Sequence, residues 1–334
     1  MGQIVKATAA IAALLLSTPA FAGWEPSKPV EIVVAAGAGG ASDQMARMMQ
    51  AAIQKNNLMK QPMVVSLKGG ASGAEALMYM KSSEGDPNKV LIAYSLIYML
   101  PLSAKIPFNW RDLTPVSVIA LDQFVLWDNV SGPKTVKEFI DAAKAASAPF
   151  KMGGTGSKRE DHVLTVFMEQ KTGAKFSYLP YKSGGEAATQ LVGGHTESNV
   201  NNPSENLEVW RAGQVRALCV FDKERISYKT KVTETQSWND IPTCKEEGLD
   251  VQYLMLRAMF LPGKVTQEQL EALADGIEIE GVRYDSIDAN IERRTGANVW
   301  IEMKLREVYP DLDIQPELCN IRQRNEVRRV FEKQ

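Results

Sequence analysis

Residues 31–49 read EIVVAAGAGGASDQMARMM, an apolar run that breaks into a glycine-rich turn and then resumes as an amphipathic pattern. This pattern predicts a buried strand, a tight turn and the first turns of a helix. The N-terminus of a helix presents unpaired backbone N–H groups and about half a positive charge to whatever lies above it. Glycine lets a ligand approach that backbone closely, and a serine adds a hydroxyl. The stretch therefore predicts an anion-binding turn.

Three later stretches, residues 63–80, 151–168 and 176–194, repeat this order of apolar run, small-residue turn and amphipathic pattern. A tight strand-to-helix turn needs glycine for its geometry alone, so a single turn of this kind says little about a ligand. Two turns before the midpoint of the chain and two after it indicate two lobes that face one anion. The turn residues that we expect near the anion are Gly39, Gly40, Ala41, Ser42, Gly70, Ala71, Ser72, Thr155, Gly156, Ser157, Ser183, Gly184 and Gly185.

The composition is that of a soluble globular protein, with 334 residues of which 45% are hydrophobic and 23% charged. This length suits two domains. The formal net charge of -2 argues against a surface for nucleic acid over most of the chain. Apolar runs at 91–96 and 215–221 alternate with helical patterns such as 134–146, which predicts an α/β fold with mainly parallel sheets. Because no low-complexity linker separates the two lobes, we expect the chain to cross between them more than once and to form a hinge and a cleft.

The N-terminal segment has the pattern of a secretory signal peptide. Lys6 precedes an apolar run at 7–16, and the A-x-A motif at 20–22 fits a cleavage site after Ala22. The apolar run is shorter than the roughly 20 residues that a membrane span needs. We therefore expect export to the periplasm, with a mature chain that starts at Gly23.

The three cysteines match no zinc or redox motif. In an oxidising compartment Cys219 and Cys244 could form a disulfide, or they could be two separate buried thiols, and Cys319 is left over. The glycines at 37–42 do not fit a dinucleotide fingerprint, and no P-loop motif is present. We expect no cofactor and no metal.

Catalytic patterns are scarce in this sequence. Ser157 and His162 are close enough along the chain for a nucleophile and a base, which leaves a periplasmic hydrolase as one alternative. No nucleophile elbow and no metalloprotease motif accompanies them. We expect a protein that is not an enzyme.

Residues 24–266 resemble the substrate-binding proteins of tripartite tricarboxylate transporters, the Bug family. The matching segments are GAGGASDQMAR (37–47), LKGGASG (67–73), GGTGSKREDH (153–162) and LPYKSGGEAATQLVGG (179–194), in family order. The resemblance implies a two-domain clamshell of the periplasmic-binding-protein type, each lobe a sheet flanked by helices, with the ligand cleft between the lobes. It also implies a monomer that captures a small carboxylate, such as a dicarboxylate or an aromatic carboxylate, and delivers it to integral-membrane transporter subunits.

The resemblance points to backbone amides and hydroxyls, rather than a compulsory arginine, as the groups that hold the ligand. Tyr181 is a further candidate for lining an aromatic-friendly cleft. The second turn departs from the family pattern because it carries Lys68, which would add a charge to the cleft. The ligand-binding residues expected in this way are Gly39, Gly40, Ala41, Ser42, Asp43, Gly70, Ala71, Ser72, Thr155, Gly156, Ser157, Tyr181, Asn201 and Asn202.

We expect a signal peptide at 1–22, a first domain at 23–122 plus 240–266, a second domain at 123–239 and an atypical tail at 267–334. The family's helices after residue 266 are not apparent in the sequence. Residues 276–307 and 325–332 instead resemble the C-terminal end of a bacterial pseudouridine synthase, so the tail looks chimeric and an RNA-interacting tail is a second alternative. The tail lacks the catalytic aspartate segment of that family, and the signal peptide argues against nucleic acid as a partner.

Overall fold

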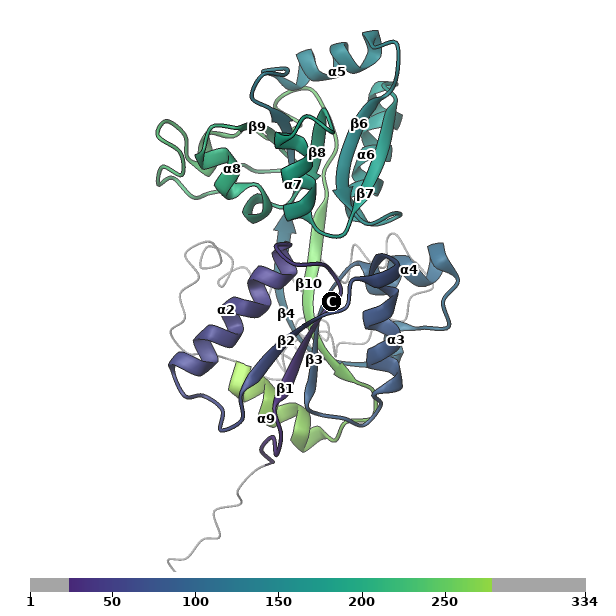
Figure 1. Ribbon diagram of the computed structural model, residues 1–334, viewed down its shortest axis with the longest axis vertical. Coiled ribbons are helices and arrows are strands. Elements are labelled where there is room, and N and C mark those ends of the chain that lie inside the picture. Colours follow the sequence, from purple (N-terminus) through teal and green to yellow (C-terminus); the bar gives the residue numbers. More distant parts are fainter. Residues whose placement is uncertain (1–23, 278–334) are drawn as a thin grey trace, which may run out of the picture.

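The computed structural model describes residues 24–277, which form two lobes, each built on a five-stranded sheet (Figure 1). The signal peptide cleavage site and the part of the tail beyond residue 277 lie outside the described residues. In the first lobe the strand order is β2-β1-β3-β10-β4. The strands of this sheet are β1 (Val30–Val34), β2 (Met63–Leu67), β3 (Lys89–Tyr94), β4 (Leu113–Gln123) and β10 (Leu254–Pro262).

The sheet of the second lobe has the order β7-β6-β8-β5-β9. Its strands are β5 (Val125–Asn129), β6 (Phe150–Thr155), β7 (Phe176–Tyr181), β8 (Ser198–Asn201) and β9 (Val215–Val220). Both sheets are mixed rather than mainly parallel. Strands β1, β2 and β3 pair in parallel, whereas β10 runs antiparallel to both of its neighbours. Likewise β6 pairs in parallel with β7 and β8, and β5 runs antiparallel to β8 and β9.

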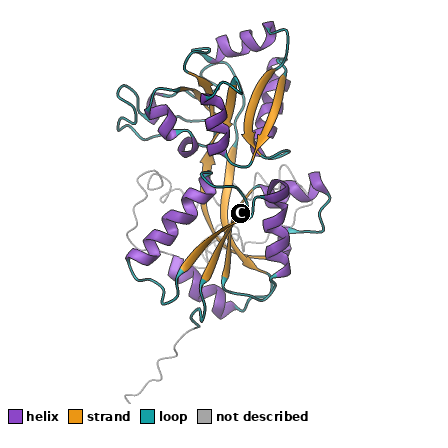
Figure 2. Cartoon of the chain, in the orientation of Figure 1, coloured by secondary structure: helices purple, strands orange, loops and turns teal. Residues whose placement is uncertain are grey.

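Helices flank both sheets (Figure 2). Those of the first lobe are α2 (Ala41–Lys55), α3 (Ala74–Ser82), α4 (Leu96–Ala104) and α9 (Gln267–Ile277), and those of the second are α5 (Val136–Ala145), α6 (Glu160–Thr172), α7 (Gly184–Val192) and α8 (Leu207–Arg211). The short 3₁₀ helices are η1 (Gly70–Gly73), η2 (Trp110–Asp112), η3 (Pro203–Glu205) and η4 (Trp238–Asp240). No helix within residues 24–277 is long and apolar enough to cross a membrane.

The chain crosses between the lobes in two places. Strand β4 runs directly into β5 through Phe124, and the chain returns from the second lobe into β10. At the junction the amide of Phe221 donates to the carbonyl of Phe124, and the amide of Tyr253 donates to the carbonyl of Phe221. These paired crossings confirm the expected two-lobed clamshell, and they form its hinge.

The second lobe extends beyond the boundary expected at residue 240. Cys219 in β9 and Cys244 form a disulfide. The amide of Val220 donates to the carbonyl of Pro242, and the amide of Cys244 donates to the carbonyl of Val220. Residues 242–244 therefore pack with β9. Of the two possibilities left open for these cysteines, the structure has the disulfide.

Helix α9 covers part of the first sheet. Its Leu270 and Leu273 are buried in one cluster with Val30, Ile32 and Met259. The expected loss of family helices directly after residue 266 is therefore wrong for residues 267–277, because the apolar spacing of this segment forms a helix that packs on the sheet.

Candidate functional site

The four small-residue turns meet in two pairs where the lobes face each other. In the first pair, the amide of Gly37 donates to the carbonyl of Lys182 at 3.0 Å, which joins the turn before α2 to the turn before α7. In the second pair, the amide of Ser157 donates to Ser72 Oγ at 3.2 Å, which joins the turn before α6 to η1. The predicted convergence of four turns from two lobes is therefore present in the fold.

The turn around η1 has an unusual backbone conformation. Ala71, Ser72 and Gly73 have φ values of 49°, 57° and 96°. These values lie in the left-handed region, which residues other than glycine rarely adopt. Gly69 is also required here, since a Cβ atom on it would lie 2.9 Å from the backbone of Ala36. The first and second turns are thus in backbone contact.

Each of the four turns has an acidic residue that accepts a hydrogen bond from one of its amides. The amides of Gly39, Gly70 and Lys182 donate to the carboxylates of Asp43, Glu75 and Glu186 at 2.9, 2.9 and 3.0 Å. The amide of Thr155 donates to Asp161. A ligand oxygen bound to any of these four amides would have to displace or share an internal carboxylate. The amide-binding prediction for the ligand stays a prediction.

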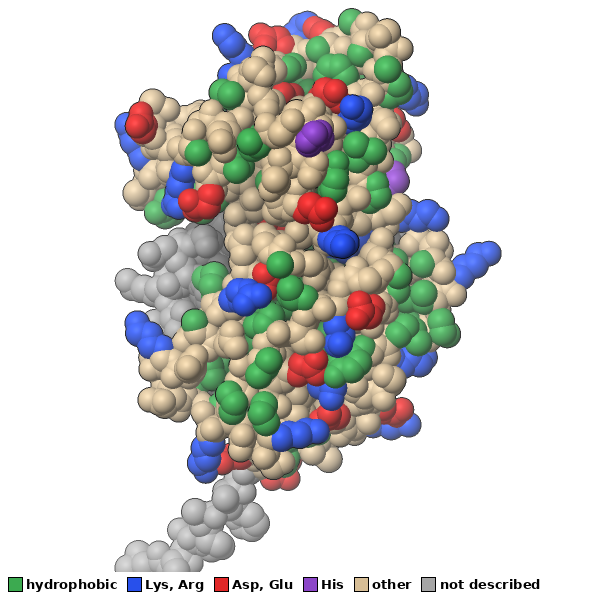
Figure 3. All heavy atoms as spheres, viewed as in Figure 1, with side chains coloured by type: hydrophobic (Ala, Val, Ile, Leu, Met, Phe, Trp, Pro, Cys, Tyr) green, Lys and Arg blue, Asp and Glu red, His purple; other side chains and the backbone are tan. Residues whose placement is uncertain are grey.

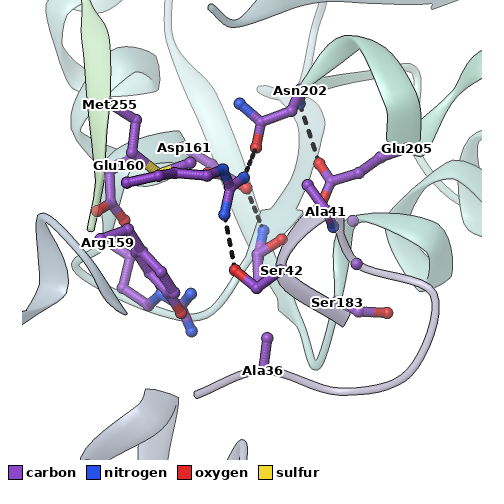
Figure 4. Close-up of a pocket in the computed structure, with 15 residues that line it drawn as sticks. Ala36, Ala41, Ser42, Arg159, Glu160, Asp161, Ser183, Asn202, Glu205 and Met255 are labelled. Carbon is purple, nitrogen blue, oxygen red and sulfur yellow. Dashed lines mark hydrogen bonds and ion pairs between the residues drawn. The ribbon is translucent and has the colours of Figure 1, made fainter. Parts of the chain in front are cut away.

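A narrow cavity, part of it open to solvent, lies between the lobes (Figure 4). Of the residues expected to bind the ligand, Gly40, Ala41, Ser42, Thr155 and Asn202 line it, together with Ser183 and Gly184 from the fourth turn.

Several expected residues do not line this cavity. Asn201 is buried behind it, with its amide group donating to the carbonyl of Gly184 and to Asn206 Oδ1. Asp43 accepts from the Gly39 amide and forms an ion pair with Arg47. The other expected residues outside the lining are Gly39, Gly70, Ala71, Ser72, Gly156, Ser157 and Tyr181.

Arg257 on β10 is a charged cavity residue that sequence reasoning missed. Its side chain is 2% exposed, and its Nε lies 2.5 Å from Asp122 Oδ2. Nη1 donates to Ser42 Oγ at 2.7 Å and Nη2 donates to Asn202 Oδ1 at 2.9 Å. This arginine therefore links the first lobe to the second. The only signal in the sequence was one charged residue within an apolar strand, LMLRAMFLP.

Arg159, at the start of α6, is a second buried arginine that was not expected. Its side chain is 5% exposed, and its guanidinium lies 4.6 Å from the ring centre of Tyr94. Nη1 donates to the carbonyl of Ser72 at 3.4 Å, whereas the buried Nε has no hydrogen-bond partner. The guanidinium therefore keeps one donor available inside the cavity.

Three acids also line the cavity, namely Glu160, Asp161 and Glu205 (Figure 4). The carboxylate of Glu205, in the second lobe, accepts from the amide of Ala41 at 2.9 Å and from that of Asn202 at 3.0 Å. It therefore occupies the N-terminus of α2 across the cleft. Gly184 leaves room for it, because a Cβ there would lie 2.2 Å from Glu205.

The protein environment raises the pKa of all three carboxyl groups. Burial is the main cause for each. For Asp161, the nearby charge of Glu205 adds to the burial and raises the pKa to about 8. Burial thus favours the uncharged form of each acid.

Ser157 and His162 are not arranged as a nucleophile and base. His162 Nδ1 accepts from the amide of Lys158 at 3.1 Å, and its ring stacks on Tyr178 with 4.1 Å between the ring centres. No hydrogen bond joins Ser157 to His162 in the described part of the chain. Within residues 24–277 no three His, Cys, Asp or Glu side chains are placed to hold a metal ion.

Charged side chains of both signs are interspersed over the two lobes on the face shown in Figure 3. No large field of one sign is seen on this face.

Comparison with known proteins identifies the family. The sequence profile described as "Tripartite tricarboxylate transporter family receptor" matches residues 45–281. The chain belongs to this family. Protein BugT of Bordetella pertussis is 32% identical to the receptor over 235 residues, which cover 67% of this chain and 68% of that protein. The family match confirms the resemblance inferred from the turns, and it makes this chain a solute-binding receptor of the periplasmic-binding-protein type.

Solved structures support the fold of the receptor. MatC from Rhodopseudomonas palustris with bound malate superposes with a TM-score of 0.69 at 19% identity, covering 78% of this chain and 87% of that one. The R. palustris protein Rpa4515 with adipate also gives 0.69, at 20% identity, covering 84% of this chain and 97% of that one.

Proposed function

We propose that this receptor is exported after cleavage at Ala22, captures a small carboxylate between its lobes as a monomer, and delivers it to integral-membrane transporter subunits without catalysing a reaction. One observation carries this proposal. The cavity between the lobes contains a buried arginine, Arg159, whose Nε has no hydrogen-bond partner and lies 3.9 Å from Glu160 Oε2. A buried cationic donor of this kind favours a carboxylate, with which it forms charge-assisted hydrogen bonds.

Hydroxyl groups supply further donors around the cavity. Ser42 Oγ accepts from Arg257, so its own hydrogen remains available for a ligand oxygen. Thr155 is buried at the cavity and presents a second hydroxyl. The dicarboxylates that accompany MatC and Rpa4515, malate and adipate, agree with a carboxylate ligand on this fold.

The test is thermal melting of the chain from Gly23 with a panel of mono-, di- and aromatic carboxylates. A ligand at a hundred times its dissociation constant adds about 2.7 kcal/mol to the stability. For lobes of this size that corresponds to roughly 5 to 10 °C in melting temperature. A shift of this order with one class of carboxylate would support the proposal, and a cooperative melt that no carboxylate shifts would contradict it.

Arg159→Met should abolish the shift that the best carboxylate produces. Arg211→Met is the matched control, because Arg211 is an exposed arginine on α8 whose partner is Glu208 in the same helix. An Arg159→Met variant that melts cooperatively and still responds fully to the carboxylate would exclude Arg159 as the ligand's partner.

A further inference from the structure

The charged groups of the cavity do not balance. Two arginines, Arg159 and Arg257, face the carboxyl groups of Glu160, Asp161 and Glu205. Arg257 has its own ion-pair partner in Asp122, which is not among the residues that line the cavity. One guanidinium, that of Arg159, therefore remains for three acids.

The three acids differ in how their oxygens are satisfied. Glu205 accepts from the amides of Ala41 and Asn202, and Asp161 accepts from the amide of Thr155. Glu160 is 1% exposed, and its buried Oε1 has no hydrogen-bond partner. Its Oε2 lies 3.9 Å from Arg159 Nε. Glu160 also has a side-chain hydrogen bond with Ser95. Arg159 and Glu160 thus form an ion pair in which one donor, Nε, and one acceptor, Oε1, have no hydrogen-bond partner.

A plain carboxylate would match only half of this arrangement. It would pair with Arg159, but beside it the three buried acids would have to stay in their uncharged form, because like charges at short range oppose one another strongly in a poorly solvated site. It would also leave Glu160 Oε1 without a donor, and an unsatisfied buried acceptor is unfavourable. A ligand that carries a cation next to its carboxylate satisfies both groups.

We propose that the ligand bears an ammonium group beside its carboxylate, as an α-amino acid does, with the carboxylate on Arg159 and the ammonium on Glu160. The inference rests on the proposed function, because it assigns the ligand class of the same cleft. An ammonium group offers three N–H donors, and in an α-amino acid it lies one carbon from the carboxylate. That spacing suits two protein groups of opposite charge that are direct neighbours.

The experiment compares ligands that differ only by the ammonium group. Isothermal titration calorimetry on the chain from Gly23 would use three pairs, namely alanine with propionate, aspartate with succinate, and phenylalanine with 3-phenylpropionate. For the pair whose remaining atoms fit the cavity, we expect the amino compound to bind at least tenfold more tightly. This comparison needs no variant, so it stands even if a substitution in the buried site prevents folding.

Glu160→Gln removes the charge while it keeps the shape of the side chain, and it should reduce the preference for the amino compound to less than threefold. Glu208→Gln is the control, since Glu208 is an exposed glutamate on α8 in the same lobe, and it should leave the preference unchanged.

The possible results separate the two proposals. Binding of a plain carboxylate as tightly as its amino partner in every pair would overturn this inference, because protons on the acids would then balance the charge, and the proposed function would stand. Full retention of the preference in a folded Glu160→Gln variant would overturn the assignment of Glu160. Absence of binding by any carboxylate, with or without an ammonium group, would remove the proposed function and this inference together.

Discussion

At the scale of single residues, Arg257 holds groups from both lobes in place around the cleft. A charged side chain that is 2% exposed is tolerated only because three acceptors surround it, Asp122, Ser42 and Asn202. Two of these acceptors come from the first lobe and its junction with β5, and Asn202 comes from the second. The same guanidinium therefore aligns the lobes and directs Ser42 Oγ toward the cavity.

Arg257→Met should lower the free energy of unfolding by about 3 kcal/mol, since removal of one partner of a buried ion pair leaves the other uncompensated. The lower end of the usual range applies because the Asp122 side chain is 25% exposed and regains water. Urea unfolding would measure the loss. The double variant Arg257→Met with Asp122→Asn should recover part of it, and a single-variant loss below about 1 kcal/mol would show that the pair contributes little.

Asp128 on β5 should make stability fall as the pH rises. Burial raises the pKa of Asp128 to about 7, and the charge of Glu197 adds to this effect while Arg216 opposes it. The unfolded chain loses the proton near pH 4, so the folded state binds more protons between about pH 4 and pH 7 and loses stability across that window. Each pKa unit corresponds to about 1.4 kcal/mol.

Asp128→Asn should lack this loss. Its stability relative to the unaltered chain should therefore be higher at pH 8 than at pH 4, as measured by urea unfolding at both values. Asp141→Asn, an exposed aspartate on α5, is the control and should show no such change. An equal effect of Asp128→Asn at both pH values would contradict the raised pKa.

Which site residues could be predicted depended on their local sequence. Ser42 and Thr155 belong to strand–turn–helix patterns that are visible along the chain, and both line the cavity. Arg159 and Glu160 stand within such a segment but read as ordinary surface charges. The burial of Arg159 depends on Tyr94 and Ser72 in the other lobe, contacts that no local pattern records.

The start of a helix could be predicted from the sequence where a nearby residue caps it. Helix α5 begins at a cap supplied by its own sequence, because Thr135 Oγ1 accepts from the Glu138 amide. Glu138 accepts from the amide of Lys134, one residue before the cap, so the reciprocal bond of a capping box is not formed. Strand direction was not predictable in the same way, since a buried apolar strand has the same composition in a parallel and an antiparallel pairing. β10 is antiparallel because the chain enters it on the way back from the second lobe.

The disulfide between Cys219 and Cys244 should stabilise the second lobe by holding the segment after β9 against that strand. It fixes the segment around Thr243 against β9 across a sequence separation of 25 residues. A loop of this length corresponds to about 3.5 kcal/mol in the chain-entropy description. The double variant Cys219→Ala with Cys244→Ala should lose a free energy of this order in urea unfolding.

Reduction of the unaltered chain with dithiothreitol should give a matching loss, and the same reductant should leave the double variant unaffected. Equal unfolding midpoints for the oxidised and reduced chain would show that the packing of the segment on β9 suffices without the covalent bond.

At the scale of the whole molecule, the lobes meet through backbone contacts as well as through the side chains of Arg159, Glu205 and Arg257. Gly37 contacts the carbonyl of Lys182, and Gly185 at the start of α7 lies against Gly39 in the first lobe. Glycine is needed at such positions because any side chain would separate the two backbones. These glycines of the first and fourth turns therefore serve the closure of the lobes, in addition to the geometry of each turn.

Gly185→Ala should weaken ligand binding without weakening the fold. The added Cβ would lie 2.8 Å from the carbonyl oxygen of Gly39, a backbone atom that cannot move aside without parting the lobes. Within its own lobe the substitution suits helix α7, where alanine is preferred to glycine by up to about 1 kcal/mol. We expect at least a tenfold loss of affinity for the best carboxylate in calorimetry, with an unchanged or higher melting temperature of the ligand-free chain.

Gly153→Ala is the matched control, because its Cβ would meet neighbours at ordinary distances of 3.4 Å or more within the second lobe. If Gly185→Ala bound the ligand as tightly as the control, capture would not require the closed contact between these two turns.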